Sequence, residues 1–260
     1  MKFALTWLTR RRFMAAATAA GASLACVSAK AQSPRPWTER RDLFPEGVAS
    51  GDPQPDSIIL WTRRPYPAGT PRAELTVEVA ADESFRSVIA SAPVPVMEES
   101  DWTCRVLVAG LRPRTTYWYR FIDSEGNGSR IGRTITAPND RDSSPVKFAF
   151  VSCQNVNEGA QNAYRRMLYE DRRAAAGEKL GFVLHLGDFI YEVVSDPNRT
   201  KTRYDRTIYD IGRIPDGRPV RNFEVPTTLE GYRFVYRAYL RDPDIQDARA
   251  YLPFVVMWDN

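Results

Sequence analysis

Histidine is almost missing from this sequence, which has one in 260 residues. Zinc fingers, histidine-rich metal sites and catalytic triads that draw on several histidines are excluded, because imidazole is their chief ligand or base. Cysteine is also scarce, with three residues, and 15 glycines and 19 prolines are too few for a low-complexity chain. We therefore expect a folded protein whose metal chemistry, if any, uses side chains other than histidine.

The body of the chain has no excess of positive charge. The formal net charge is +4, but residues 1–31 contain five Lys/Arg and no Asp or Glu. The rest of the chain contains the other 31 of the 36 basic residues and all 32 acidic residues. The body is thus close to neutral, and it lacks the electrostatic footprint that nucleic-acid binding requires.

Residues 1–31 have the pattern of an export signal. Residues 9–13 read TRRRF, an uncharged alanine-rich run follows at 15–25, and Ala-Lys-Ala at 29–31 is a small-x-small cleavage pattern. The run is too short to span a bilayer, and the arginine pair resembles a twin-arginine signal. We therefore predict export by the twin-arginine translocation machinery to the periplasm or medium, with no transmembrane segment in the mature protein.

Residues 41–138 are predicted to form a β-sandwich. Short runs of β-branched and aromatic residues alternate with turn residues and contain no helical pattern. Residues 110–117, which end at Tyr117, are similar to the tyrosine corner of fibronectin type III domains, in which the tyrosine hydroxyl bonds to upstream backbone. The strands are expected at 57–62, 75–80, 104–108 and 116–122.

A polar, proline-flanked linker at 139–145 precedes a segment, 146–260, with a different pattern. Apolar strands alternate there with amphipathic helices, which favours a doubly wound, mostly parallel α/β sheet. Thr227 and Glu230 form a capping box that predicts the start of the second helix. The strands are expected at 146–151, 182–186 and 254–258.

Four potential metal ligands follow the ends of these strands. Cys153 offers a thiolate, Asp188 a carboxylate that can bridge two ions, Tyr191 a phenolate and Asn260 a carbonyl oxygen. Ligands in parallel α/β sheets bind at the carboxyl ends of the strands, and this mixture of donors suits ferric iron better than Mg²⁺ or Ca²⁺. Each residue alone has a structural alternative: a buried thiol, a cap, a core aromatic and a terminal residue.

Several motifs resemble those of one enzyme family. FVLHLGDFIYE at 182–192 is similar to the G-D-x-x-Y block of calcineurin-like and purple-acid metallophosphoesterases, in the form found in PhoD-like alkaline phosphatases. VSCQN at 151–155 resembles that family's first metal block, with Cys in place of the usual Asp. Residues 232–260 and FPEGVASGDP at 44–53 are similar to two further family segments.

The resemblance implies an exported alkaline phosphatase or phosphodiesterase with a fibronectin III-like N-terminal sandwich. Cys153 and Tyr191 would bind Fe³⁺, Asp188 would bridge it to a neighbouring Ca²⁺, and Asn260 would bind the second ion and contact the phosphate. A metal-bound hydroxide would then attack a phosphate monoester or diester in line. His185 is interpreted as a strand residue behind the site.

The family's remaining ligands, mainly histidines, would follow residue 260, and a dinuclear site needs about six to eight protein ligands. The chain is therefore interpreted as the truncated N-terminal part of a phosphatase, inactive by itself. One alternative is an exported β-sandwich binding module without catalysis. Another is a structural protein with a Cys104–Cys153 disulfide. The arginine-rich insertion at 195–226 is interpreted as a solvated loop, since acidic residues are interleaved with the arginines.

Overall fold

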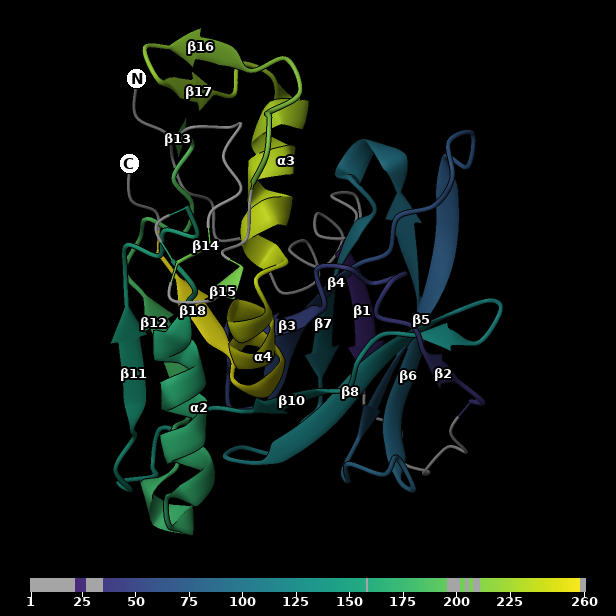
Figure 1. The fold of residues 1–260 in the computed structure, drawn as a ribbon. Helices are drawn as coiled ribbons and strands as arrows, with labels where there is room; N and C mark the ends of the chain where they lie inside the picture. Colours follow the sequence, from purple (N-terminus) through teal and green to yellow (C-terminus); the bar gives the residue numbers. More distant parts are fainter. Residues whose placement is uncertain are drawn as a thin grey trace, which may run out of the picture.

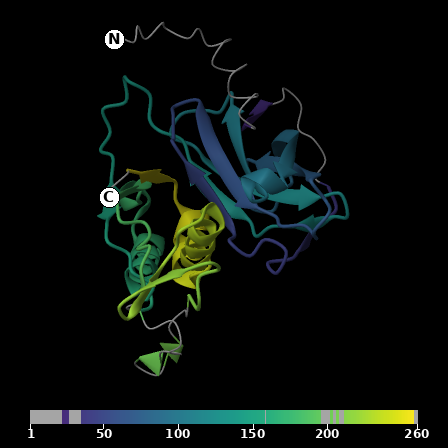
Figure 2. The same cartoon turned by 90° about the horizontal axis from the view of Figure 1, so that it is seen from above.

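A computed structural model describes residues 22–26, 35–157, 159–195, 202–203, 206–207 and 211–257. Within these ranges the chain forms a β-sandwich and an α/β part, which lie side by side in both views (Figures 1 and 2). None of the helices in these ranges has the length and apolarity that crossing a bilayer requires. Most of the proposed export signal, and Asn260, lie outside the described residues.

The sandwich packs two sheets around one apolar core. Inward-facing residues alternate along the strands, as in β4, where Ile58 and Leu60 are fully buried. All four strands expected from the sequence are present. One sheet contains β1 (Ala22–Cys26), β7 (Thr103–Ala109), β4 (Ser57–Arg63) and β3 (Val48–Gly51). The other contains β2 (Thr38–Glu39), β9 (Asn127–Gly128), β8 (Thr116–Asp123), β5 (Arg72–Ala80), β6 (Val88–Met97) and β10 (Gly132–Ile135).

Two further features of the sandwich concern Tyr117 and the strand β6. The Tyr117 hydroxyl accepts a hydrogen bond of 2.9 Å from the backbone N–H of Arg112, which confirms the bond expected of a tyrosine corner. Strand β6, which sequence analysis did not predict, contains Pro93 and Pro95. It lies at the edge of its sheet, where a missing N–H leaves no ladder bond unmade.

The α/β part has the predicted parallel strands, with helices against one face. Strand β12 lies between β11 and β18 and pairs in parallel with both. Val183 and Phe254 are buried in the core that the helices cover, whereas Phe148 and Phe150 are exposed on the opposite face. The doubly wound expectation, with helices on both faces, is wrong for the described residues. The elements are β11 (Phe148–Val151), α2 (Asn162–Arg173), β12 (Phe182–His185), α3 (Leu229–Leu240), α4 (Pro243–Tyr251) and β18 (Phe254–Val256).

The predicted start of α3 is wrong by one residue. Thr228, not Thr227, is the N-cap, and its hydroxyl accepts a bond of 3.1 Å from the N–H of Gly231. Thr227 instead donates to a backbone carbonyl, and Glu230 pairs with Arg237. The sequence offers two adjacent threonines, and local pattern alone does not distinguish them.

The insertion is more ordered in its described parts than a solvated loop. Ile211 and Ile214 are buried in the core of the α/β part. Glu224 is also buried and accepts a bond of 2.7 Å from the N–H of Ile214. The short strands in this region are β13 (Val194–Ser195), β14 (Thr202–Arg203), β15 (Arg206–Thr207), β16 (Arg218–Val220) and β17 (Phe223–Val225).

Strands β3 and β18 join the sandwich and the α/β part into a single seven-stranded sheet. Gly51 of β3 is the register partner of Phe254 in β18. A Cβ atom at position 51 would lie 2.8 Å from the carbonyl oxygen of Phe254, closer than side-chain carbons approach backbone oxygen. Glycine at this position therefore permits the close approach of the two strands.

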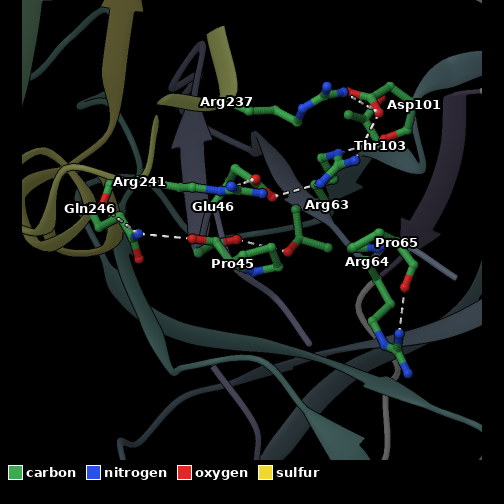
Figure 3. Close-up of polar contacts among 12 residues, drawn as sticks. Pro45, Glu46, Arg63, Arg64, Pro65, Asp101, Thr103, Arg237, Arg241 and Gln246 are labelled. Carbon is green, nitrogen blue, oxygen red and sulfur yellow. Dashed lines mark hydrogen bonds and ion pairs between the residues drawn. The ribbon is translucent and has the colours of Figure 1, made fainter. Parts of the chain in front are cut away.

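A buried ionic network reinforces this junction (Figure 3). Glu46 of the sandwich has no exposed surface, and its carboxylate lies 3.1 Å from Arg63 and 2.8 Å from Arg241, the C-cap of α3. Asp101 pairs with the same Arg63 at 2.8 Å and with Arg237 of α3 at 3.0 Å. The two carboxylates thus connect the sandwich to successive turns of one helix.

Removing the buried charge should destabilise the protein strongly. The Glu46→Gln variant removes the carboxylate that Arg63 and Arg241 share. Because Arg63 keeps its pair with Asp101, the cost should lie at the lower end for a broken buried pair, about 3 kcal/mol. We expect a loss of that size in the free energy of unfolding, measured by urea denaturation. Glu39→Gln is the matched control, because Glu39 pairs with Arg41 on the surface and should lose less than a third as much. Equal losses in the two variants would contradict a junction held by buried charge.

Candidate functional site

The candidate site lies beyond the carboxyl ends of β11 and β12. Val151 and His185 are register partners at these ends, so the segments that follow leave the sheet side by side. The N–H of Cys153 donates to the carbonyl oxygen of Gly187 at 3.3 Å. Cys153 and Asp188 both have left-handed backbone, with φ values of 55° and 51°.

Three of the four predicted site residues meet at one carboxylate oxygen. The sulfur of Cys153 lies 3.4 Å from Oδ2 of Asp188, and the hydroxyl of Tyr191 lies 2.9 Å from the same oxygen. Interactions with Cys153 and Asp188 raise the pKa of Tyr191, because ionising the phenol would place a second negative charge beside the carboxylate. The thiol and the phenol are both hydrogen-bond donors to Asp188.

The fourth predicted residue, Asn260, lies outside the described residues. Strand β18 nevertheless runs parallel to β12 toward the same edge, and the N–H of Met257 donates to the carbonyl oxygen of His185 at 2.9 Å. Within the described ranges no group of three or more His, Cys, Asp and Glu side chains is placed to hold a metal ion. The cluster of Cys153, Asp188 and Tyr191 differs from such a group because its third donor is a tyrosine phenol.

His185 occupies the position expected of a strand residue behind the site. Its ring is fully buried, and Nδ1 accepts a bond of 3.3 Å from the N–H of Gly187. Burial lowers the pKa of His185, and the nearby Asp188 carboxylate opposes this shift only in part. The imidazole is therefore neutral at physiological pH, and it packs against Phe189 with ring centroids 5.0 Å apart.

Polar side chains that sequence analysis did not single out position the loop that contains Asp188 and Tyr191. Gln154 is buried; its amide donates to the carbonyl oxygen of Phe189 at 2.8 Å and accepts from the Tyr164 hydroxyl at 2.6 Å. The hydroxyl of Tyr239, on α3, accepts the N–H of Tyr191 at 3.0 Å. VSCQN contains Gln154, but only the three-dimensional contacts reveal its role as a support.

The two cysteines of the proposed disulfide alternative are both free. Cys104 is buried in the core of the sandwich on β7, whereas Cys153 is exposed beyond β11. Burial raises the pKa of Cys104 to about 12. Cys104 is thus an inert core thiol, and the thiol of Cys153 remains available to a ligand.

Comparisons with known proteins agree on one family. A profile described as "PhoD-like phosphatase, N-terminal domain" matches residues 28–138, and one described as "PhoD-like phosphatase" matches residues 148–260. Alkaline phosphatase D of Bacillus subtilis (strain 168) is 36% identical over 224 residues, which are 84% of this chain and 35% of that protein. A solved structure of PhoD matches with a TM-score of 0.65 and 33% identity, over 84% of this chain and 39% of the other. The chain therefore spans little more than a third of the length of these relatives.

Thiol chemistry distinguishes the two cysteines. In a Cys26→Ser background, we expect one rapidly reacting thiol, Cys153, in the native protein. Cys104 should react on the order of 100-fold more slowly or only after unfolding, because it is buried and protonated. Reaction with 5,5′-dithiobis(2-nitrobenzoate) followed by peptide mapping measures both rates. Two fast thiols, or none, would contradict this description of the site.

Proposed function

Because the chain belongs to the PhoD-like phosphatase family, we propose that its α/β part forms one side of the metal centre of a phosphoric ester hydrolase. The observation that carries the proposal is the meeting of Cys153, Asp188 and Tyr191 at one carboxylate oxygen. The substrate class is phosphate monoesters or diesters. The sandwich, with its tyrosine-corner bond, is proposed to be the fibronectin III-like N-terminal domain of that enzyme.

The donor set fits a Lewis-acidic cation. The thiol and the phenol both hydrogen-bond to the carboxylate, which is already an anionic ligand, and each of the two would become one on losing its proton. Cys153 and Tyr191 would hold Fe³⁺, Asp188 would bridge it to Ca²⁺, and Asn260 would complete the second ion's ligands on this chain. When bound, the cations would supply positive charge that stabilises the phosphoryl oxygens during transfer.

The protein's own residues prepare this arrangement. The carboxylate of Asp188 accepts hydrogen bonds from Cys153 and Tyr191, and a bound cation would take the place of their protons. Gln154 and Tyr239 bond to the backbone of Phe189 and Tyr191. The side chains of Asp188 and Tyr191 are therefore already in place before a ligand binds. Support by neighbouring hydrogen-bonding groups of this kind tunes both ligand orientation and basicity.

Hydrolysis is tested in a hybrid, in which this chain replaces the matching segment of the Bacillus subtilis alkaline phosphatase D. We expect the hybrid to hydrolyse p-nitrophenyl phosphate. Asp188→Asn should lower kcat/KM on the order of 100-fold or more, because even a residue that only supports a metal ligand is worth about 10- to 100-fold. Asp142→Asn is the matched control, since Asp142 pairs with Arg114 on the sandwich side. A folded hybrid that is inactive, or one indifferent to Asp188→Asn, would contradict the proposal.

Export by the twin-arginine pathway is the proposed route to the periplasm or medium. Replacing both Arg10 and Arg11 by Lys should retain the protein in the cytoplasm, because the arginine pair is the recognised feature of such a signal. Arg12→Lys keeps that pair and the basic charge, so it should be exported normally. Cell fractionation with immunoblotting measures the distribution. Export of the double variant at the rate of the unaltered chain would show that another route is used.

A further inference from the structure

A cavity of about 460 Å³ lies away from the candidate metal site, between the sandwich and the helices α2 and α4. This volume is within the range of small-molecule sites. None of Cys153, Asp188 and Tyr191 lines it. The residues that line it are Glu83, Trp118, Arg130, Ile131, Arg133, Arg172, Asp247, Ala250 and Tyr251.

Strands β8 and β10 form one wall of the cavity. Trp118 and Arg133 are register partners on these antiparallel strands, so their side chains project from the same face. Ile131 precedes Arg133 by two residues and lines the same cavity. This wall therefore presents an aromatic ring next to a guanidinium group.

Two guanidinium groups lie against the ring of Tyr251, the last residue of α4. Arg133 lies 4.6 Å and Arg172, from α2, lies 5.4 Å from the ring centroid. Arg133 also donates to the carbonyl oxygen of Tyr251 at 3.1 Å. In the described part of the chain, neither arginine has a carboxylate within ion-pair distance. Among the described residues, Arg133 is thus held by the ring, a backbone oxygen and a 3.5 Å bond to the Thr116 hydroxyl, and Arg172 by the ring alone, so several of their N–H donors remain for a ligand.

The other charges of the cavity neutralise this pair only in part, because Glu83 is the one lining carboxylate left to oppose it. Asp247 is already paired with Arg130 at 2.7 Å, and Glu83 is an exposed residue of the sandwich. Nε of Arg130 is buried and has no hydrogen-bond partner among the described residues. The net charge of the lining residues is therefore positive, and Nε of Arg130 is a buried donor that remains without an acceptor in the described part of the chain.

We propose that this cavity binds a small organic oxyanion that contains a planar ring, such as an aryl phosphonate or aryl carboxylate. The guanidinium groups of Arg133 and Arg172 match the planar geometry of an oxyanion, and Trp118 offers an apolar surface to the ring. The proposal goes beyond the phosphatase function and uses neither the metal donors nor a bound cation.

Phenylphosphonate is the probe, because its carbon–phosphorus bond is not an ester and it combines a ring with an oxyanion. Calorimetric titration of the whole chain, in the presence of EDTA, should show saturable binding at one site. Inorganic phosphate, which lacks the ring, should bind at least fivefold more weakly. Arg172→Gln should weaken phenylphosphonate binding about tenfold, since it removes a charge-assisted hydrogen-bond donor.

Two control variants locate the binding. Arg173→Gln changes the neighbouring residue of α2, which lies 5.3 Å from the ring of Tyr169 and does not line the cavity; binding should be unchanged. Asp188→Asn alters the metal site and should also leave it unchanged, so failure here is distinct from failure of the phosphatase proposal. Absence of saturable binding up to about 10 mM, equal loss in Arg172→Gln and Arg173→Gln, or loss only in Asp188→Asn would overturn the proposal.

Discussion

The parallel register between β11 and β12 is the constraint on which the candidate site depends. It places Val151 beside His185. The two loops that follow are then close enough for the N–H of Cys153 to donate a hydrogen bond to the carbonyl oxygen of Gly187. A one-residue slip would turn each strand's buried side chains to the exposed face. It would also separate the thiol from the carboxylate. The arrangement of the candidate site thus depends first on the pairing of these two strands.

Helix α3 connects this site to the rest of the molecule. Tyr239 of α3 bonds to the backbone of Tyr191, and Arg241, the C-cap of the same helix, pairs with the buried Glu46 of the sandwich. The sandwich is therefore more than an appended domain, because its buried charge helps to orient the helix that supports the candidate site. The shared sheet, through β3 and β18, adds a second rigid connection between the two parts.

Local patterns predicted much of this arrangement. The alternation of apolar residues predicted the strands, and the rule for parallel sheets brought Cys153, Asp188 and Tyr191 together. The pairing of Gly51 with Phe254 and the ion pair of Glu46 with Arg241 were not predictable. Each joins residues about 200 positions apart, and neither leaves a periodicity or a motif. Helix α4 was not predicted, because a proline such as Pro243 can follow the end of one helix or stand in the first turn of the next.

The central claim is that the thiol, the phenol and the carboxylate form one ligand set for a Lewis-acidic ion. X-ray absorption spectroscopy of the whole chain loaded with ferric iron tests it most directly. We expect a sulfur neighbour in the first coordination shell of the iron, which disappears in Cys153→Ser, while oxygen neighbours remain. An iron environment without sulfur in the unaltered protein, or one identical in the two proteins, would contradict it.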